Sequence, residues 1–127
     1  MIEGYDIDLH ARKDGDLSIK TTWEEKEYYP TVIHLAAKTF VPYSWDSPVE
    51  FIRNNTLSTT CALEYCRDKK SKLILLSSYM YGNTSNLPTS EKEPLSVSNP
   101  YGLSKLLCEN ICDFYSCLLY TSPSPRD

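Results

Sequence analysis

The chain has 127 residues, which is enough for one domain with a modest core, and its 41% hydrophobic and 24% charged residues are typical of a globular protein. Acidic residues (17) outnumber basic residues (13), and the formal charge of −4 argues against nucleic-acid and anionic-membrane partners. No apolar run approaches the length of a membrane span, and the five cysteines include no C-x-x-C pair that would indicate a zinc or dithiol site. We therefore expect a cytoplasmic protein without a metal centre.

Apolar alternation and proline placement predict four elements before residue 40: strands over 5–9 and 17–19, a helix over 21–29, and a buried strand over 31–37. A turn at Asp14-Gly15-Asp16 separates the first two strands, and Pro30 ends the helix. A loop that contains Pro42 is expected to follow the third strand.

Ser47 and Glu50 flank Pro48 in a capping-box pattern, which predicts a helix that begins at 48 and ends at 66 or 67. Its inner face is expected to carry residues spaced three and four apart: Ile52, Asn55, Thr59, Ala62 or Leu63, and Cys66. A strand over 73–76, buried on both faces, should end at Ser77-Ser78, and Asn99-Pro100 should cap a last helix over 101–115. Strands that alternate with helices predict an α/β fold, in which a parallel sheet has helices on both sides.

The last eleven residues, 117–127, do not continue the helical pattern that precedes them. They resemble a translated sequencing adapter, and a native Ser/Pro-rich tail is the alternative. We therefore expect residues 117–127 to be a non-native tail, residues 1–116 to form the domain, and the native protein to continue beyond Ser116.

Tyr101 and Lys105 lie four residues apart in the last predicted helix, so their side chains share one face. A free phenol has a pKa of about 10 and is a poor base at neutral pH. A nearby fixed cation stabilises a phenolate, which would make Tyr101 a usable general acid/base. The alternative is a surface tyrosine beside a surface lysine, because this spacing also occurs by chance.

Small or polar residues follow two of the predicted strands, at the sheet edge where open α/β folds bind ligands. The hydroxyls of Ser77-Ser78 could bond a substrate oxygen or simply end the strand. Ala36-Ala37 would let the backbone approach a cofactor closely or form a small-residue packing site, and His34 is expected in the core. Asn55 is polar on an inward helical face, so it must either bridge backbone groups or line a polar site.

Four ordered motifs stand at characteristic separations: Val32-Ile-His-Leu-Ala-Ala37, Pro42-Tyr-Ser44 with Asn54-Asn55, Ser77 to Gly82, and Asn99-Pro-Tyr-Gly-Leu-Ser-Lys105. On these motifs the chain resembles the extended short-chain dehydrogenase/reductase superfamily, and within it the NAD-dependent nucleotide-sugar epimerase/dehydratase family. The resemblance covers nearly all of residues 1–116.

The resemblance implies that Tyr101 is the acid/base on a sugar hydroxyl, that Lys105 tunes it and binds the nicotinamide ribose, and that Ser77 polarises the same sugar oxygen. Hydride transfer to NAD would give a transient keto sugar, which an epimerase reduces on its other face. Besides Tyr101 and Lys105, the residues that match cofactor contacts of the family are Asp16, Leu17, Leu35, Ala36, Ala37, Thr39 and Asn55.

The chain departs from the family pattern at two places. No G-x-x-G-x-x-G loop is present, and Met1-Ile-Glu-Gly4 looks like the end of the family's first helix. The implied fold is a partial Rossmann-like doubly wound parallel sheet that lacks the first strand and the glycine-rich loop, so we expect the chain alone to fold weakly and to bind dinucleotide poorly. Ser78-Tyr79 stands where dehydratases of the family carry an Asp-Glu pair, which disfavours dehydration.

The resemblance therefore predicts an enzyme, a nucleotide-sugar 4-epimerase that uses NAD and acts on a nucleotide sugar, with the fragment inactive alone and the full-length protein a homodimer. Arg12 and Lys13 could accept a 2′-phosphate, so NADP stays open beside NAD. The alternatives are a ketoreductase or dehydratase of the same family and a non-catalytic, dinucleotide-binding regulatory protein. Regulatory relatives usually lack the tyrosine or the lysine, whereas this chain has both.

Overall fold

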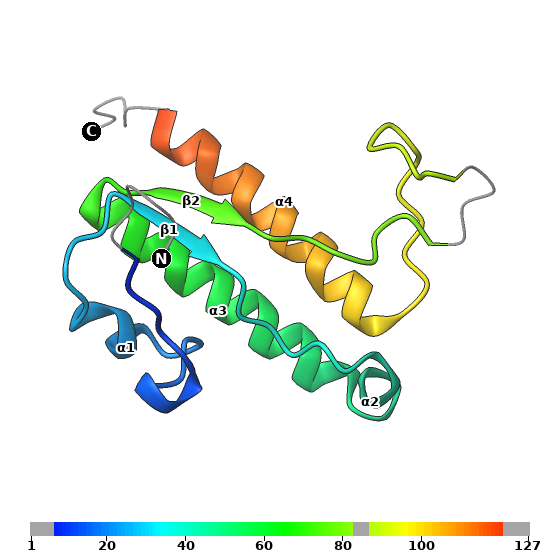
Figure 1. The fold of residues 1–127 in the computed structure, drawn as a ribbon, viewed down its shortest axis with the longest axis horizontal. Coiled ribbons are helices and arrows are strands. Elements are labelled where there is room, and N and C mark those ends of the chain that lie inside the picture. Colours follow the sequence, from blue (N-terminus) through cyan, green and yellow to red (C-terminus); the bar gives the residue numbers. More distant parts are fainter. Residues whose placement is uncertain (1–6, 83–86, 121–127) are drawn as a thin grey trace, which may run out of the picture.

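The computed structural model describes residues 7–82 and 87–120 (Figure 1). Along these residues the chain forms a short 3-10 turn, four helices and two strands: η1 (Arg12–Asp14), α1 (Lys20–Glu24), β1 (Thr31–His34), α2 (Val41–Asp46), α3 (Pro48–Lys69), β2 (Lys72–Leu75) and α4 (Pro100–Tyr120). Figure 1 shows α3 and α4 running along the length of the molecule, with the two strands beside them.

The two strands form a parallel pair, with Thr31 opposite Lys72 and His34 opposite Leu75. Parallel strands need a crossover connection between them, and here α2 and α3 supply it. The pairing confirms the predicted α/β fold, a partial Rossmann-like parallel sheet in which these two strands are neighbours.

The longest packed interface joins α3 to α4 (Figure 1). The predicted inner face of α3 is confirmed, because its members from Asn55 to Cys66 are buried, while Ile52 is half-buried. Because an α-helix has 3.6 residues per turn, side chains at this spacing form one stripe, and that stripe meets the neighbouring elements.

The hydrophobic core lies between α1, α3 and one face of the sheet. Its buried members are Trp23, Ala62, Tyr65 and Cys66, and Val32 and Leu73 of the two strands pack against them. The Trp23 indole N–H donates to the Leu17 carbonyl at 2.9 Å, so the one polar atom of this ring is satisfied inside the core.

The prediction that the strand over 73–76 is buried on both faces is wrong for the described residues. Alternate side chains of a strand point to opposite faces, and the helices pack on the Val32 and Leu73 side. On the other side Ile33 is 61% exposed and Ile74 is 52% exposed, and Leu35 and Leu76 continue this apolar row. The predicted second layer of helices is not present within residues 7–82 and 87–120.

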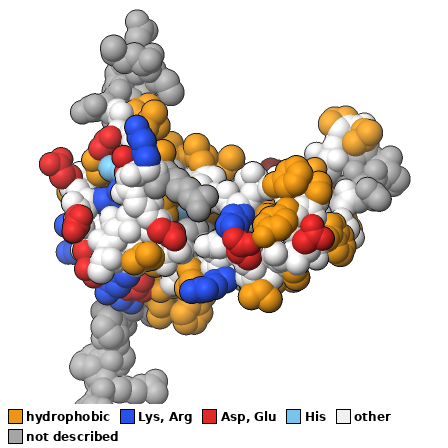
Figure 2. Space-filling view, turned by 90° about the horizontal axis from the view of Figure 1, so that it is seen from below, with side chains coloured by type: hydrophobic (Ala, Val, Ile, Leu, Met, Phe, Trp, Pro, Cys, Tyr) orange, Lys and Arg blue, Asp and Glu red, His pale blue; other side chains and the backbone are white. Residues whose placement is uncertain are grey.

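Apolar side chains are also exposed away from the sheet, among them Trp45, Val49 and Phe114. Figure 2 shows hydrophobic side chains interspersed with charged ones on the face that it displays. In the part of the chain that the structure describes, no helix is both long enough and apolar enough to span a bilayer.

The N-terminal part differs most from the sequence prediction. Residues 7–9 of the predicted strand over 5–9 are not in a strand, and residues 5 and 6 lie outside the described residues. Residues 17–19 form a turn instead of a strand, because the Asp16 carboxylate accepts hydrogen bonds from the Ser18 N–H at 2.9 Å and from its hydroxyl at 2.8 Å. Such local bonds compete with a strand ladder.

Several element boundaries also differ. The helix predicted over 21–29 is shorter and lies at Lys20–Glu24. The strand predicted over 31–37 is β1, which ends at His34. The expected loop around Pro42 contains the short helix α2, in whose first turn proline is tolerated. Helix α4 continues to Tyr120, so four residues of the expected tail are helical, whereas residues 121–127 lie outside the described residues.

The capping box before α3 forms only in part. Ser47 is the N-cap residue and Pro48 follows it, but the Ser47 side chain makes no capping hydrogen bond. The Glu50 carboxylate instead forms an ion pair with the Lys38 ammonium. Glu50 therefore has a charged partner on the segment after β1.

Candidate active site

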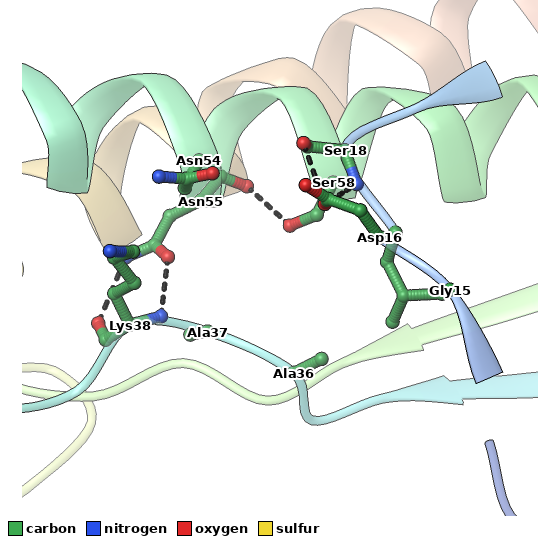
Figure 3. Close-up of a pocket in the computed structure, with 10 residues that line it drawn as sticks. Gly15, Asp16, Ser18, Ala36, Ala37, Lys38, Asn54, Asn55 and Ser58 are labelled. Atoms are coloured by element: carbon green, nitrogen blue, oxygen red, sulfur yellow. Dashed lines mark hydrogen bonds between the residues drawn. The ribbon is translucent and has the colours of Figure 1, made fainter. Parts of the chain in front are cut away.

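Three segments that are far apart in the sequence line one cavity of about 190 Å³ (Figure 3). The first is the turn before α1, the second follows β1 directly, and the third is one face of α3. The lining residues are Gly15, Asp16, Leu17, Ser18, Ala36, Ala37, Lys38, Asn54, Asn55 and Ser58. The cavity therefore lies beyond the carboxyl end of a parallel strand, where open α/β sheets bind ligands.

The turn at Gly15 needs a glycine for two reasons. Its φ of +126° is outside the range that side chains favour, and a Cβ there would lie 2.6 Å from the Thr22 side chain. Asp16 and Ser18 follow directly and close the turn with their own hydrogen bonds. This wall of the cavity is thus held by local bonding and not by a sheet partner.

Asn55 joins the opposite walls through its side-chain amide. Its Oδ1 accepts from the Lys38 backbone N–H at 2.7 Å, and its Nδ2 donates to the Lys38 carbonyl at 3.2 Å and to the Ser104 hydroxyl at 2.8 Å (Figure 3 draws Asn55 and Lys38). Ser104 in turn donates to the Tyr101 carbonyl at 2.6 Å. The amide therefore connects α3, the segment after β1 and the first turn of α4.

Five of the predicted cofactor residues come together in this cavity: Asp16, Leu17, Ala36, Ala37 and Asn55. Leu35 and Thr39 are exposed and are not among the residues that line it, so their contact with a cofactor stays a prediction. Sequence reasoning did not single out Asn54 and Ser58, although they lie one and three residues from Asn55 on the same helix. Their positions next to Asn55 and one helical turn after it could have indicated that they line the same cavity.

The start of α4 is capped as predicted. The Asn99 Oδ1 accepts from the Gly102 N–H at 2.7 Å, and Pro100 occupies the first helical position. Tyr101 and Lys105 follow on the first two turns and are both buried, with 6% and 3% of their surface exposed. The prediction of a shared face is consistent with this, and the alternative of a surface pair is wrong.

Neither functional group of this pair is used by the fold. Among the described residues, no hydrogen bond or ion pair engages the Tyr101 phenol or the Lys105 ammonium. Burial lowers the pKa of Lys105, and nearby groups including Glu109 oppose that shift. Burial disfavours the charged form of a lysine, and groups whose pKa is shifted in this way cluster at functional sites.

His34 lies in the interior, as expected. Its Nε2 is 3.4 Å from the Ser58 hydroxyl, and its ring packs edge-on to Trp23 at a centroid distance of 6.4 Å. Burial lowers the pKa of His34 to about 4, and the charge of Lys105 adds to this shift.

Ser77 comes two residues after β2 and is half-buried. Its hydroxyl lies 3.2 Å from the Met80 sulfur, and within the described residues it makes no hydrogen bond to Tyr101. Tyr79 follows two residues later, and its ring packs edge-to-face on the Tyr101 ring at 5.8 Å. The role of Ser77 on the substrate oxygen therefore stays a prediction.

A parallel β pair, packed helices and a cavity beyond the end of β1 define a Rossmann-like domain of the dinucleotide-binding type. A family model described as GDP-mannose 4,6 dehydratase matches residues 16–119. The UDP-glucose 4-epimerase of Halalkalibacterium halodurans is 33% identical over 107 residues, which cover 76% of this chain and 32% of the relative.

Solved structures agree with this match. UDP-glucose 4-epimerase from Bifidobacterium longum, in complex with NAD+ and UDP, has a TM-score of 0.75 at 33% identity, over 82% of this chain and 33% of that one. RMD from Pseudomonas aeruginosa, complexed with NADPH, has a TM-score of 0.74 at 28% identity, over 82% of this chain and 38% of that one.

The chain therefore belongs to the NAD-dependent epimerase/dehydratase family of the short-chain dehydrogenase/reductase superfamily, which confirms the resemblance seen in the sequence. It spans about a quarter to a third of the length of the curated relatives that it matches.

Proposed function

We propose that the protein containing this chain is an NAD-dependent nucleotide-sugar 4-epimerase. The observation that carries the proposal is the convergence of Asp16, Ala36 and Asn55 on one cavity, from segments that are far apart in the sequence. Tyr101 and Lys105 are buried at the start of α4, and the Tyr101 carbonyl is connected to the cavity through Ser104 and Asn55.

The cavity suits one end of a dinucleotide. Its volume of about 190 Å³ is below the roughly 300–1,000 Å³ of a typical small-molecule pocket, so it is too small for a whole dinucleotide, and Asp16 and Leu17 match the family's adenine contacts. The Asp16 carboxylate can accept hydrogen bonds from hydroxyl or amino groups. Ala36 and Ala37 carry the smallest side chains after glycine, so a ligand can approach the backbone between β1 and Lys38.

Bound NAD would supply the hydride acceptor for oxidation of a sugar hydroxyl. Tyr101 would take the proton of that hydroxyl and later return it, while the fixed charge of Lys105 would stabilise the phenolate. Ser77 would hold the same sugar oxygen by a hydrogen bond, with its hydroxyl turned from the Met80 sulfur to the substrate. Burial of Tyr101 and Lys105 would keep bulk water from screening these interactions.

Epimerisation is favoured over dehydration by the residues after Ser77. Dehydratases of the family carry an Asp-Glu pair there, and this chain has Ser78-Tyr79, neither of which is a carboxylic acid. Removal of water from a sugar needs a further acid and base, and in the dehydratases the Asp-Glu pair supplies them. NAD is the proposed cofactor, and the NADPH complex of RMD keeps NADP as the second candidate.

The test uses the full-length protein that contains this chain, with NAD and UDP-glucose, and detection of the C4 epimer. Tyr101→Phe should lower kcat by about a hundredfold or more and affect NAD binding much less, because only the acid/base hydroxyl is lost. Tyr28→Phe is the matched control, since Tyr28 is exposed and lies outside the site.

The proposal is refuted if no UDP-hexose gives an epimer or a keto sugar, or if Tyr101→Phe turns over like the parent. A regulatory protein would bind NAD in both variants and turn over none of these substrates. NAD binding by the full-length protein can be measured separately by calorimetry, with Asp16→Ala as the variant expected to weaken it.

A further inference from the structure

Tyr79 adopts a backbone conformation that a large side chain rarely takes. Its φ is +62°, in the left-handed region that favours glycine and asparagine. Among the described residues the other non-glycine example is Lys70, which is the C-cap of α3, where this conformation is common. Tyr79 caps no helix, and strained backbone of this kind often accompanies functional sites.

The left-handed turn places the Tyr79 ring on the ring of the proposed acid/base. The centroids of Tyr79 and Tyr101 are 5.8 Å apart, and the planes meet at 71°, an edge-to-face arrangement that aromatic pairs favour. Tyr79 is 60% exposed, whereas Tyr101 is 6% exposed. Tyr79 therefore forms part of the cover of Tyr101 and is itself open to solvent.

The backbone around Tyr79 is docked firmly on the segment that leads into α4. A Cβ on Gly102 would lie 2.8 Å from the Tyr79 carbonyl oxygen, so only a glycine at 102 allows this approach. The Met80 carbonyl accepts from the Ser96 N–H at 2.8 Å, and the Met80 side chain is buried. These contacts fix the backbone that carries the Tyr79 ring.

We propose that Tyr79 is a positioning residue for Tyr101, an inference that rests on the proposed role of Tyr101 as acid/base. The Tyr79 ring holds the Tyr101 ring in one orientation by packing alone and makes no hydrogen bond to its hydroxyl. The phenol is oriented, but its hydroxyl is not engaged in a hydrogen bond with Tyr79, so its proton stays available for a substrate oxygen. Fixing a reacting group in this way lowers the entropic part of the barrier.

The direct test is NMR of the chain with ring-labelled tyrosine, in which Tyr101→Phe assigns the Tyr101 signals. Tyr79→Gly removes the ring and suits the left-handed backbone, so it should fold. We expect it to shift the Tyr101 ring signals and to speed the flipping of that ring. Tyr79→Phe keeps the ring and should leave both unchanged, as should Tyr28→Ala, whose exposed fraction of 60% matches that of Tyr79.

The second readout is turnover by the full-length protein. Tyr79→Gly should lower kcat by about tenfold or more with KM for the nucleotide sugar little changed, and Tyr79→Phe should restore it. Unchanged Tyr101 ring signals in Tyr79→Gly would overturn the inference, and so would changed signals with unchanged kcat. If instead Tyr101→Phe is fully active, the proposed function fails, while the ring signals still decide whether Tyr79 orients Tyr101.

Discussion

Loss of the Asn55 side chain should destabilise the chain by several times more than loss of its neighbour Asn54. Asn55 is 2% exposed and makes three hydrogen bonds, two to the Lys38 backbone and one to the Ser104 hydroxyl. A hydrogen bond within a protein contributes about 1 kcal/mol net, so Asn55→Ala should cost about 3 kcal/mol. Part of this cost arises because the Lys38 N–H is left without its acceptor.

Asn54→Ala is the matched control, because Asn54 has the same side chain on the same helix. It makes one hydrogen bond, from its Nδ2 to the Glu50 carbonyl at 3.0 Å, and its loss should cost about 1 kcal/mol or less. Asn55→Asp is the sharper variant. It keeps the acceptor oxygen for the Lys38 N–H but replaces two donated bonds by a buried charge, so it should be at least as damaging as Asn55→Ala.

The measurement is urea unfolding followed by circular dichroism at pH 7, with the parent and the three variants at one protein concentration. A difference between Asn55→Ala and Asn54→Ala smaller than about 1 kcal/mol would refute the bridging role of Asn55. Parent-like stability of Asn55→Asp at pH 7 would refute it independently, because an ionised aspartate cannot donate the two bonds.

Two further predictions concern His34 and Gly102. Folding lowers the pKa of His34 from 6.5 to about 4. As the pH falls, His34 is therefore protonated in the unfolded chain before it is protonated in the folded chain. The free energy of unfolding should drop by up to about 3 kcal/mol between pH 6.5 and pH 4. Urea midpoints at pH 7 and 5 should therefore differ less in His34→Asn than in the parent, and an equal difference would contradict the assignment. Gly102→Ala should lower Tm, because its Cβ would meet the Tyr79 carbonyl at 2.8 Å, although alanine usually stabilises a helix interior by about 1 kcal/mol. A Tm above that of the parent would show that this contact relaxes freely.

Features that depend on neighbouring residues were predictable. The inner face of α3 follows from spacings of three and four, and the start of α4 follows from Asn99-Pro100, because both depend on helix geometry alone. The parallel pairing of β1 with β2 was also predicted, since a strand, a long helix and a second strand allow few other arrangements.

Features that depend on competing or distant partners were not predictable. The apolar alternation at 17–19 suggested a strand, yet the Asp16 carboxylate bonds the Ser18 N–H and holds the segment in a turn. Glu50 matched a capping box, and the pattern did not indicate its ion pair with Lys38, which is 12 residues away in the sequence. In both places a side chain makes a contact that competes with the predicted pattern and that the pattern itself does not contain.

By itself, the sequence determined the two long helices, the two strands that form the parallel pair and the family that the chain resembles, because those features rest on local periodicity and on ordered motifs. Only the tertiary structure decided that Asp16, Ala36 and Asn55 share one cavity, and that Tyr79 packs on Tyr101. It alone decided, too, that Ile33 and Ile74 stay exposed. The physical reason is that burial and side-chain contact depend on what the rest of the chain brings alongside, which no short stretch of sequence contains.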